Sequence, residues 1–129
     1  MTAIEHSVVD KEDLIKRAKE AFKAVQKGSK LRDHYIKLVV MNNIMRAFVV
    51  AYKMPAEFQA SQEAFLETLV RVENRKNRAW LTSDLIVVQE ALHAYETIIE
   101  SSDEEMIAEM LEFVNYNREQ GRWAIMKKK

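Results

Sequence analysis

The stretch 90–96, EALHAYE, is where this 129-residue sequence comes nearest to a chemical motif. His93 follows Glu90 by three residues and precedes Glu96 by three. A Glu-x-x-His spacing places two metal ligands on one face of a helix, as in carboxylate-bridged metal bundles. One hypothesis is therefore a helical metal-carboxylate protein that uses Glu90 and His93.

The helix that carries this motif argues against a metal site. At about 100° per residue, its apolar side chains fill one arc, and Glu90 and His93 lie roughly opposite. The arc consists of Leu85, Val88, Ala91, Leu92, Tyr95, Ile98 and Ile99. Ligands in a bundle project inward and need a second Glu-x-x-His from another helix, but His6 and His34 lack that spacing. We therefore expect a solvated face, with no metal and no cofactor.

Other catalytic chemistry has no motif in the sequence. The absence of cysteine removes thiolate nucleophiles and cysteine-based metal sites. The two glycines, Gly28 and Gly121, cannot build a phosphate-binding loop. Carboxylate pairs such as Glu63 and Glu67 are ordinary on an exposed helix face. The sequence predicts a protein that is not an enzyme, and its N-terminus lacks the features of a signal peptide, so we expect a cytoplasmic location.

Cap residues, breakers and apolar spacing predict five helices and no strand. The first two expected helices are 11–27, between Asp10 and Gly28, and a helix from Ser29 to about Lys53. The third runs from Pro55 to about Trp80, and the fourth covers about 84–100 and is started by Thr82 or Ser83. The fifth begins at a capping box formed by Ser102 and Glu105 and ends at Gly121.

The second predicted helix contains the run IKLVVMNNIMRAFVVAYKM, which is apolar nearly all the way round. Such a helix must be covered on several sides. Polar interruptions, such as Asn42 and Arg46, leave it far short of the roughly 20 apolar residues that a membrane span needs. We expect an all-α fold in which residues 1–129 form a single compact bundle around this central helix. In the alternative, one side of the helix faces solvent or a second chain.

The formal net charge is zero, but the two halves of the chain differ in sign. Residues 1–53 hold 11 Lys and Arg against 6 Asp and Glu, and residues 54–129 hold 9 against 14. Within the second half, residues 84–119 carry ten acids against Arg118 alone. Either the basic first helix pairs with the acidic helices inside one domain, or the acids form a surface for a basic partner.

Direct nucleic-acid binding is an alternative function. The first helix carries Lys16, Lys19, Lys23 and Lys27, and a second basic cluster consists of Arg71, Arg75, Lys76 and Arg78. These side chains could contact phosphates. The near-neutral composition and the acidic fourth helix argue against it, because neither helix that follows a turn suits a DNA groove.

The C-terminal segment GRWAIMKKK holds an apolar cluster that includes Trp123 and Met126. This cluster either folds back on the bundle or docks on a partner, because Trp and Met are enriched at protein interfaces. We take Trp123 and Met126 as candidate anchors within reach of the fifth helix, and Glu104, Glu105, Glu109 and Glu112 of that helix as candidate acidic contacts. Arg71, Arg75 and Arg78 form the next candidate contact.

The opening MTAIEHSVVDKEDLIKRAKEAF, together with the chain length, resembles the small RNA-polymerase-associated protein of T-even bacteriophages. This resemblance implies a phage-encoded protein in the host cytoplasm that binds the RNA polymerase core and alters transcription. It brings no motif that assigns a role to any residue. We therefore expect a regulator that binds a larger intracellular protein, most simply RNA polymerase, with an oligomeric state that the sequence leaves open.

Overall fold

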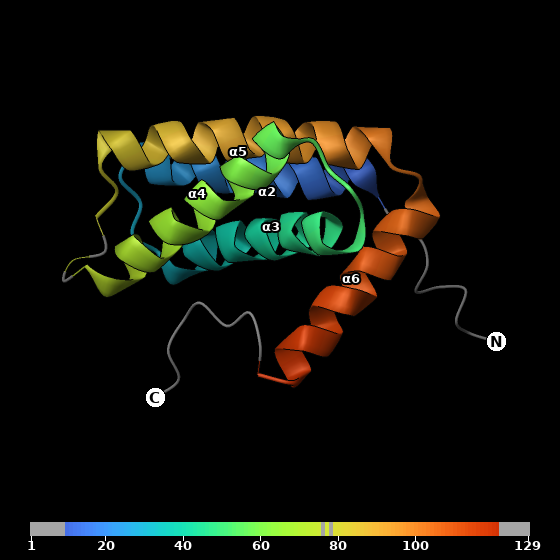
Figure 1. Ribbon diagram of the computed structural model, residues 1–129. Helices are drawn as coiled ribbons and strands as arrows, with labels where there is room; N and C mark the ends of the chain where they lie inside the picture. Colours follow the sequence, from blue (N-terminus) through green and yellow to red (C-terminus); the bar gives the residue numbers. More distant parts are fainter. Residues whose placement is uncertain (1–9, 76, 78, 122–129) are drawn as a thin grey trace.

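The computed structural model describes residues 10–75, 77 and 79–121, which form five α-helices and no strand (Figure 1). The helices are α2 (Lys11–Gln26), α3 (Arg32–Ala51), α4 (Ala56–Asn74), α5 (Thr82–Ser101) and α6 (Glu104–Glu119). The prediction of an all-α bundle is confirmed.

The start and end of α2 follow the predicted signals. The Asp10 carboxylate accepts a hydrogen bond from the backbone N–H of Asp13 at 3.0 Å, which caps the first turn. Gly28 has φ 95°, a left-handed conformation that favours glycine and turns the chain towards α3. The sequence therefore predicts this helix correctly, because both signals are local.

The starts of α3 and α5 differ from the prediction. Helix α3 begins after Leu31, whereas Ser29 lies in the preceding turn and accepts a hydrogen bond from the Leu31 N–H at 3.3 Å. Helix α5 begins after Leu81, so Thr82 and Ser83 lie within its first turn. The predicted caps were wrong because a leucine, whose side chain cannot accept a hydrogen bond, stands at the cap position of each helix.

The start of α6 is displaced by one residue. Asp103 is the cap, and its carboxylate accepts from the Met106 N–H at 2.8 Å. Ser102, the predicted cap, instead donates its hydroxyl to the Ile98 carbonyl at 2.8 Å and is buried at the end of α5. The predicted capping box with Glu105 is therefore wrong.

Helix α4 ends well before the predicted residue Trp80. Asn74 is its last residue, and Arg75 has extended backbone dihedrals, φ −75° and ψ 146°. Two tertiary contacts hold the segment that follows. The Arg75 guanidinium bonds to Asp84 in α5, and the Trp80 ring lies 6.4 Å from the Tyr35 ring of α3, between centroids. Neither contact has a local signature in the sequence.

Helix α3 is central, as predicted, because it packs against α2, α4, α5 and α6. Its largest fully buried side chains are Leu38, Met41, Ile44, Met45 and Phe48. Figure 1 shows α2, α3 and α5 running side by side, and α4 packs across α3 and α5. Helix α6 leaves the end of α5 at an angle and packs against α3. Ile36, Val40 and Val50 of α3 are exposed. One side of the central helix therefore reaches solvent in part, as the alternative prediction held.

Two of the polar residues that interrupt the apolar run of α3, Asn42 and Asn43, are buried and hydrogen-bonded. The side-chain amide of Gln62 in α4 donates a hydrogen bond to the side-chain oxygen Oδ1 of Asn42 at 3.0 Å, and both residues are buried. Buried amides that satisfy one another favour one register of the two helices, because a shift would leave them unpaired. The contact therefore helps to fix α4 against α3.

Candidate protein-interaction surfaces

The four predicted acidic contacts lie on one face of α6. Projected at about 100° per residue, Glu104, Glu105, Glu109 and Glu112 fall within an arc of about 140°, and all four are exposed. We call these four residues the acidic face. The structure thus places all four candidate residues on one exposed face of α6.

The opposite side of α6 explains why this face points outward. Ile107, Met110 and Val114 are buried, and α6 packs mainly against α3. Glu104 and Glu105 also lie in the first turn of the helix, where the helix dipole favours negative charge. The apolar side of α6 therefore faces α3, and the glutamates on the other side of the helix face solvent.

Within the described part of the chain, none of the four glutamates of the acidic face takes part in an ion pair. By contrast, Glu96 of α5 pairs with Lys19 of α2 at 3.0 Å. The expected pairing of the basic first helix with acidic helices is therefore realised at α5. The acidic face of α6 keeps its charge available to another molecule.

An aromatic side chain that we did not select from the sequence lies within the same arc. Tyr116 is 52% exposed and projects between Glu105 and Glu109 when α6 is viewed along its axis. Tyrosine is a common contact residue at protein interfaces. The same projection that groups the glutamates would have found it. Trp123 and Met126, the predicted apolar anchors, lie outside the described residues, as does Arg78.

The other two predicted arginines are held at the turn between α4 and α5. Arg75 bonds to the Asp84 carboxylate and donates to the Ala79 carbonyl at 2.7 Å, whereas Arg71 lies 3.8 Å from Asp84 and is exposed. The hydrogen bond to Asp84 raises the pKa of Arg75. The hydrogen bonds of Arg75 are therefore made within the protein. Of the two arginines, only Arg71 is exposed to solvent.

A second ion pair lies beside this turn. Arg32 donates to both carboxylate oxygens of Glu73, at 2.7 and 3.1 Å, and its guanidinium lies 5.2 Å from the centre of the Tyr35 ring. The hydrogen bond to Glu73 raises the pKa of Arg32. The pair joins the start of α3 to the end of α4, and no local pattern in the sequence predicts this contact.

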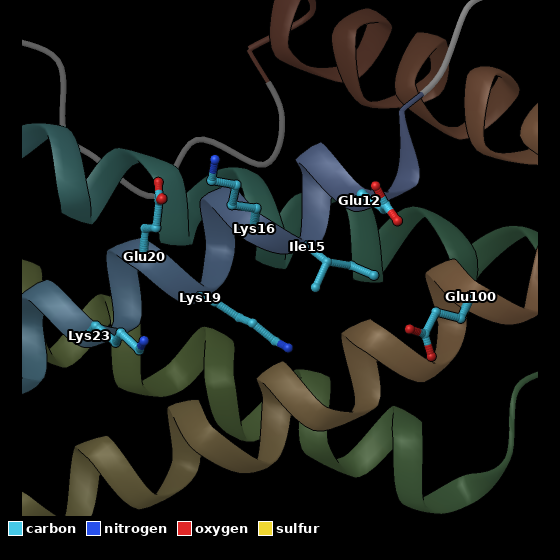
Figure 2. A pocket seen from close by; sticks show the side chains of 7 residues that line it. All are labelled: Glu12, Ile15, Lys16, Lys19, Glu20, Lys23 and Glu100. Atoms are coloured by element: carbon cyan, nitrogen blue, oxygen red, sulfur yellow. The ribbon is translucent and has the colours of Figure 1, made fainter.

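The lysines of α2 border a shallow groove beside α5. It has a volume of about 360 Å³ and is lined by Lys16, Lys19, Lys23, Glu12, Glu20, Glu100 and Ile15. Figure 2 shows Lys19 pointing across the groove towards α5, while Lys16 and Glu20 point away from α5. Because equal numbers of lysines and glutamates line the groove, it offers a phosphate backbone little net attraction.

No protein-family model, curated protein or solved structure matches this chain.

The residues of EALHAYE do not converge on one point. Glu90 and His93 are exposed on α5, whereas Glu96 is half-buried against Lys19 of α2. Among the residues that the structure describes, no group of three or more His, Asp or Glu side chains could hold a metal ion. None of the described helices combines the length and apolarity that crossing a bilayer requires.

Proposed function

We propose that this protein is a non-catalytic regulator that binds a larger intracellular protein through the acidic face of α6. One observation carries the proposal: four exposed glutamates share one face of a helix, and none of them is neutralised by a described residue. A partner with a basic surface would be attracted and oriented by this face. The resemblance of the opening residues indicates RNA polymerase as the partner, and regulation of transcription as the outcome.

Apolar contacts are needed in addition to charge, because buried anchors usually supply most of the binding energy. Tyr116 is exposed among the glutamates and is the candidate anchor within the part of the chain that the structure describes. Trp123 and Met126 follow α6 in the sequence and are the further candidates. In this proposal the acidic face speeds the encounter, and the aromatic and methionine side chains slow the dissociation.

Binding to purified bacterial RNA polymerase core tests the proposal. We expect the change of Glu104, Glu105, Glu109 and Glu112 to Gln to lower the association rate by about tenfold at low salt. The matched control changes four other exposed glutamates to Gln and so alters the net charge equally. These control residues are Glu57, Glu63, Glu67 and Glu90.

The two sets of anchors need separate variants. Tyr116→Ala and a chain that ends at Gly121 should each raise the dissociation rate without changing the salt dependence of association. If the acidic-face variant and the control variant associate with polymerase core at equal rates, the interface is not on the acidic face of α6. If polymerase core does not bind the wild-type protein, the partner assignment is wrong.

A further inference from the structure

Two exposed leucines lie at the end of the bundle where α2 turns into α3 and α4 turns into α5. Leu31 is 66% exposed and Leu81 is 51% exposed. Figure 1 shows the two turns at the same end of the molecule. Leu31 and the half-buried Trp80 line one small hollow, and Leu81 directly follows Trp80. Leu31 therefore lies beside the Trp80 side chain, and Leu81 is the next residue along the chain.

Both leucines stand where the fold favours a polar residue. Each is the residue before the first turn of its helix, and no side chain caps the backbone N–H groups of that turn from this position. Serine, threonine, aspartate and asparagine stabilise a helix at this position, and leucine does not. A leucine at a cap position neither caps the helix nor, when exposed, adds to the core. Residues that lower stability in this way are typical of functional surfaces.

The surroundings of the leucines are basic. Among the described residues of segments 23–35 and 71–84, six lysines and arginines stand against three acids, Asp33, Glu73 and Asp84. Two of these three acids are already bonded to arginines, Glu73 to Arg32 and Asp84 to Arg75. The exposed Lys27 and Lys30 pair with none of these acids, and the exposed Arg71 shares Asp84 with Arg75, so a positive surplus remains around the leucines.

We propose that Leu31, Trp80 and Leu81, with Lys27, Lys30 and Arg71, form a docking surface for an acidic polypeptide segment that carries apolar side chains. We call these six residues the leucine surface. The cations complement the acidic groups of the segment, and the leucines and Trp80 receive its apolar groups. A polypeptide fits better than a nucleic acid, because a phosphate backbone offers leucine no apolar partner.

The leucine surface is separate from the acidic face of α6. The 20 residues of α3 run from the leucine surface towards the end of the bundle where α6 begins, a distance of about 30 Å. A partner held at the first turns of α6 would leave the leucine surface open. The protein could then bind two molecules at once. A partner with a basic surface would bind the acidic face of α6, and an acidic segment would bind the leucine surface. The inference does not depend on the function proposed above.

Fluorescence anisotropy with two labelled peptides tests this surface on the full chain. One peptide repeats the unit Glu-Asp-Leu, and the other repeats Glu-Asp-Ser at the same length. We expect the leucine peptide to bind about tenfold more tightly than the serine peptide. The double variant Leu31→Ser, Leu81→Ser should lose this difference, and Lys27→Gln with Lys30→Gln should weaken the binding of both peptides.

Matched controls separate this result from unfolding and from non-specific adhesion. The serine variants place capping residues at helix starts, so thermal unfolding should show a folded protein. Val50→Ser removes an equally exposed apolar side chain from a different part of α3 and should leave peptide binding unchanged. The glutamine variant of the acidic face should also bind the leucine peptide as the wild type does.

Three outcomes would overturn the proposal. In the first, the two peptides bind equally, which reduces the interaction to charge alone. In the second, the double serine variant keeps the wild-type affinity for the leucine peptide. In the third, duplex DNA binds more tightly than the leucine peptide and is unaffected by the serine changes, which would assign this end to nucleic acid.

Discussion

Arg75 and Asp84 join the end of α4 to the start of α5 through an ion pair in which Asp84 is buried and Arg75 is half-buried. The Asp84 carboxylate is 1% exposed, and it also accepts a hydrogen bond from the Leu81 N–H at 2.8 Å. The Arg75 guanidinium donates in addition to the Ala79 carbonyl at 2.7 Å. One carboxylate therefore holds both sides of the turn, which explains why α4 stops before Trp80.

The first prediction is that Asp84→Asn lowers the free energy of unfolding by about 2 kcal/mol, because it removes the charge that balances Arg75. Burial raises the pKa of Asp84, but the hydrogen bonds from Arg75 and Leu81 outweigh it, so the net pKa is lower than usual. The carboxylate therefore stabilises the fold above the unfolded pKa of about 3.9. This contribution is lost as the pH falls through the lower folded pKa.

Urea unfolding of the wild type and Asp84→Asn at about pH 7 and about pH 3 measures this effect. The difference between the two proteins should shrink at the lower pH. Asp33→Asn is the matched control, since Asp33 lies near the start of α3 and pairs with Lys37 at 3.2 Å on the surface. Its effect should stay below about 1 kcal/mol. A difference for Asp84→Asn that does not change with pH would contradict the ion-pair account.

Leu81→Ser should stabilise the protein. Asp84 already accepts a hydrogen bond from the N–H of residue 81, and a serine hydroxyl there could accept from the Asp84 N–H in return, which completes a capping box. We expect a gain of about 1 kcal/mol in the free energy of unfolding. Ile86→Ser, at an exposed position inside α5, is the control and should give no gain. A loss of stability in Leu81→Ser would show that the leucine has a structural role.

The central position of α3 predicts a strong contrast between two nearby residues. Phe48 is completely buried, whereas Val50 is 60% exposed. Phe48→Ala should lower the free energy of unfolding by about 3–5 kcal/mol, because it leaves a cavity among four helices. Val50→Ala should change it by less than about 0.5 kcal/mol. Similar values for both variants, measured by denaturant unfolding, would show that the helix is rotated from its position here.

Helix α6 should open more readily than the rest of the bundle. It packs mainly against α3, whereas α3 and α5 are each covered by several helices. Local opening costs less free energy where fewer apolar contacts must separate. Native-state hydrogen exchange should therefore show faster exchange in residues 107–119 than in residues 38–48 or 91–99. Equal protection in all three segments would mean that α6 unfolds only with the whole protein.

The acidic face shows which parts of a candidate site can be read from the sequence. Glu104, Glu105, Glu109 and Glu112 could be grouped from helical spacing alone, and the structure shows them exposed on a common face of α6. Arg75 could not be assigned in this way, because its ion pair depends on the path of the chain between two helices. Leu31 and Leu81 were missed because nearby polar residues looked like the caps.

The sequence alone determined the helical class, the central place of α3 and the start of α2. Each of these depends on local signals, namely apolar periodicity and the Asp10 and Gly28 positions, which act over a few residues. Only the tertiary structure decided where α4 ends and where α5 begins, because the Arg75 and Asp84 contact outweighs local helix preference. It also decided which charges remain free, since pairing such as that of Lys19 with Glu96 requires two helices to be side by side.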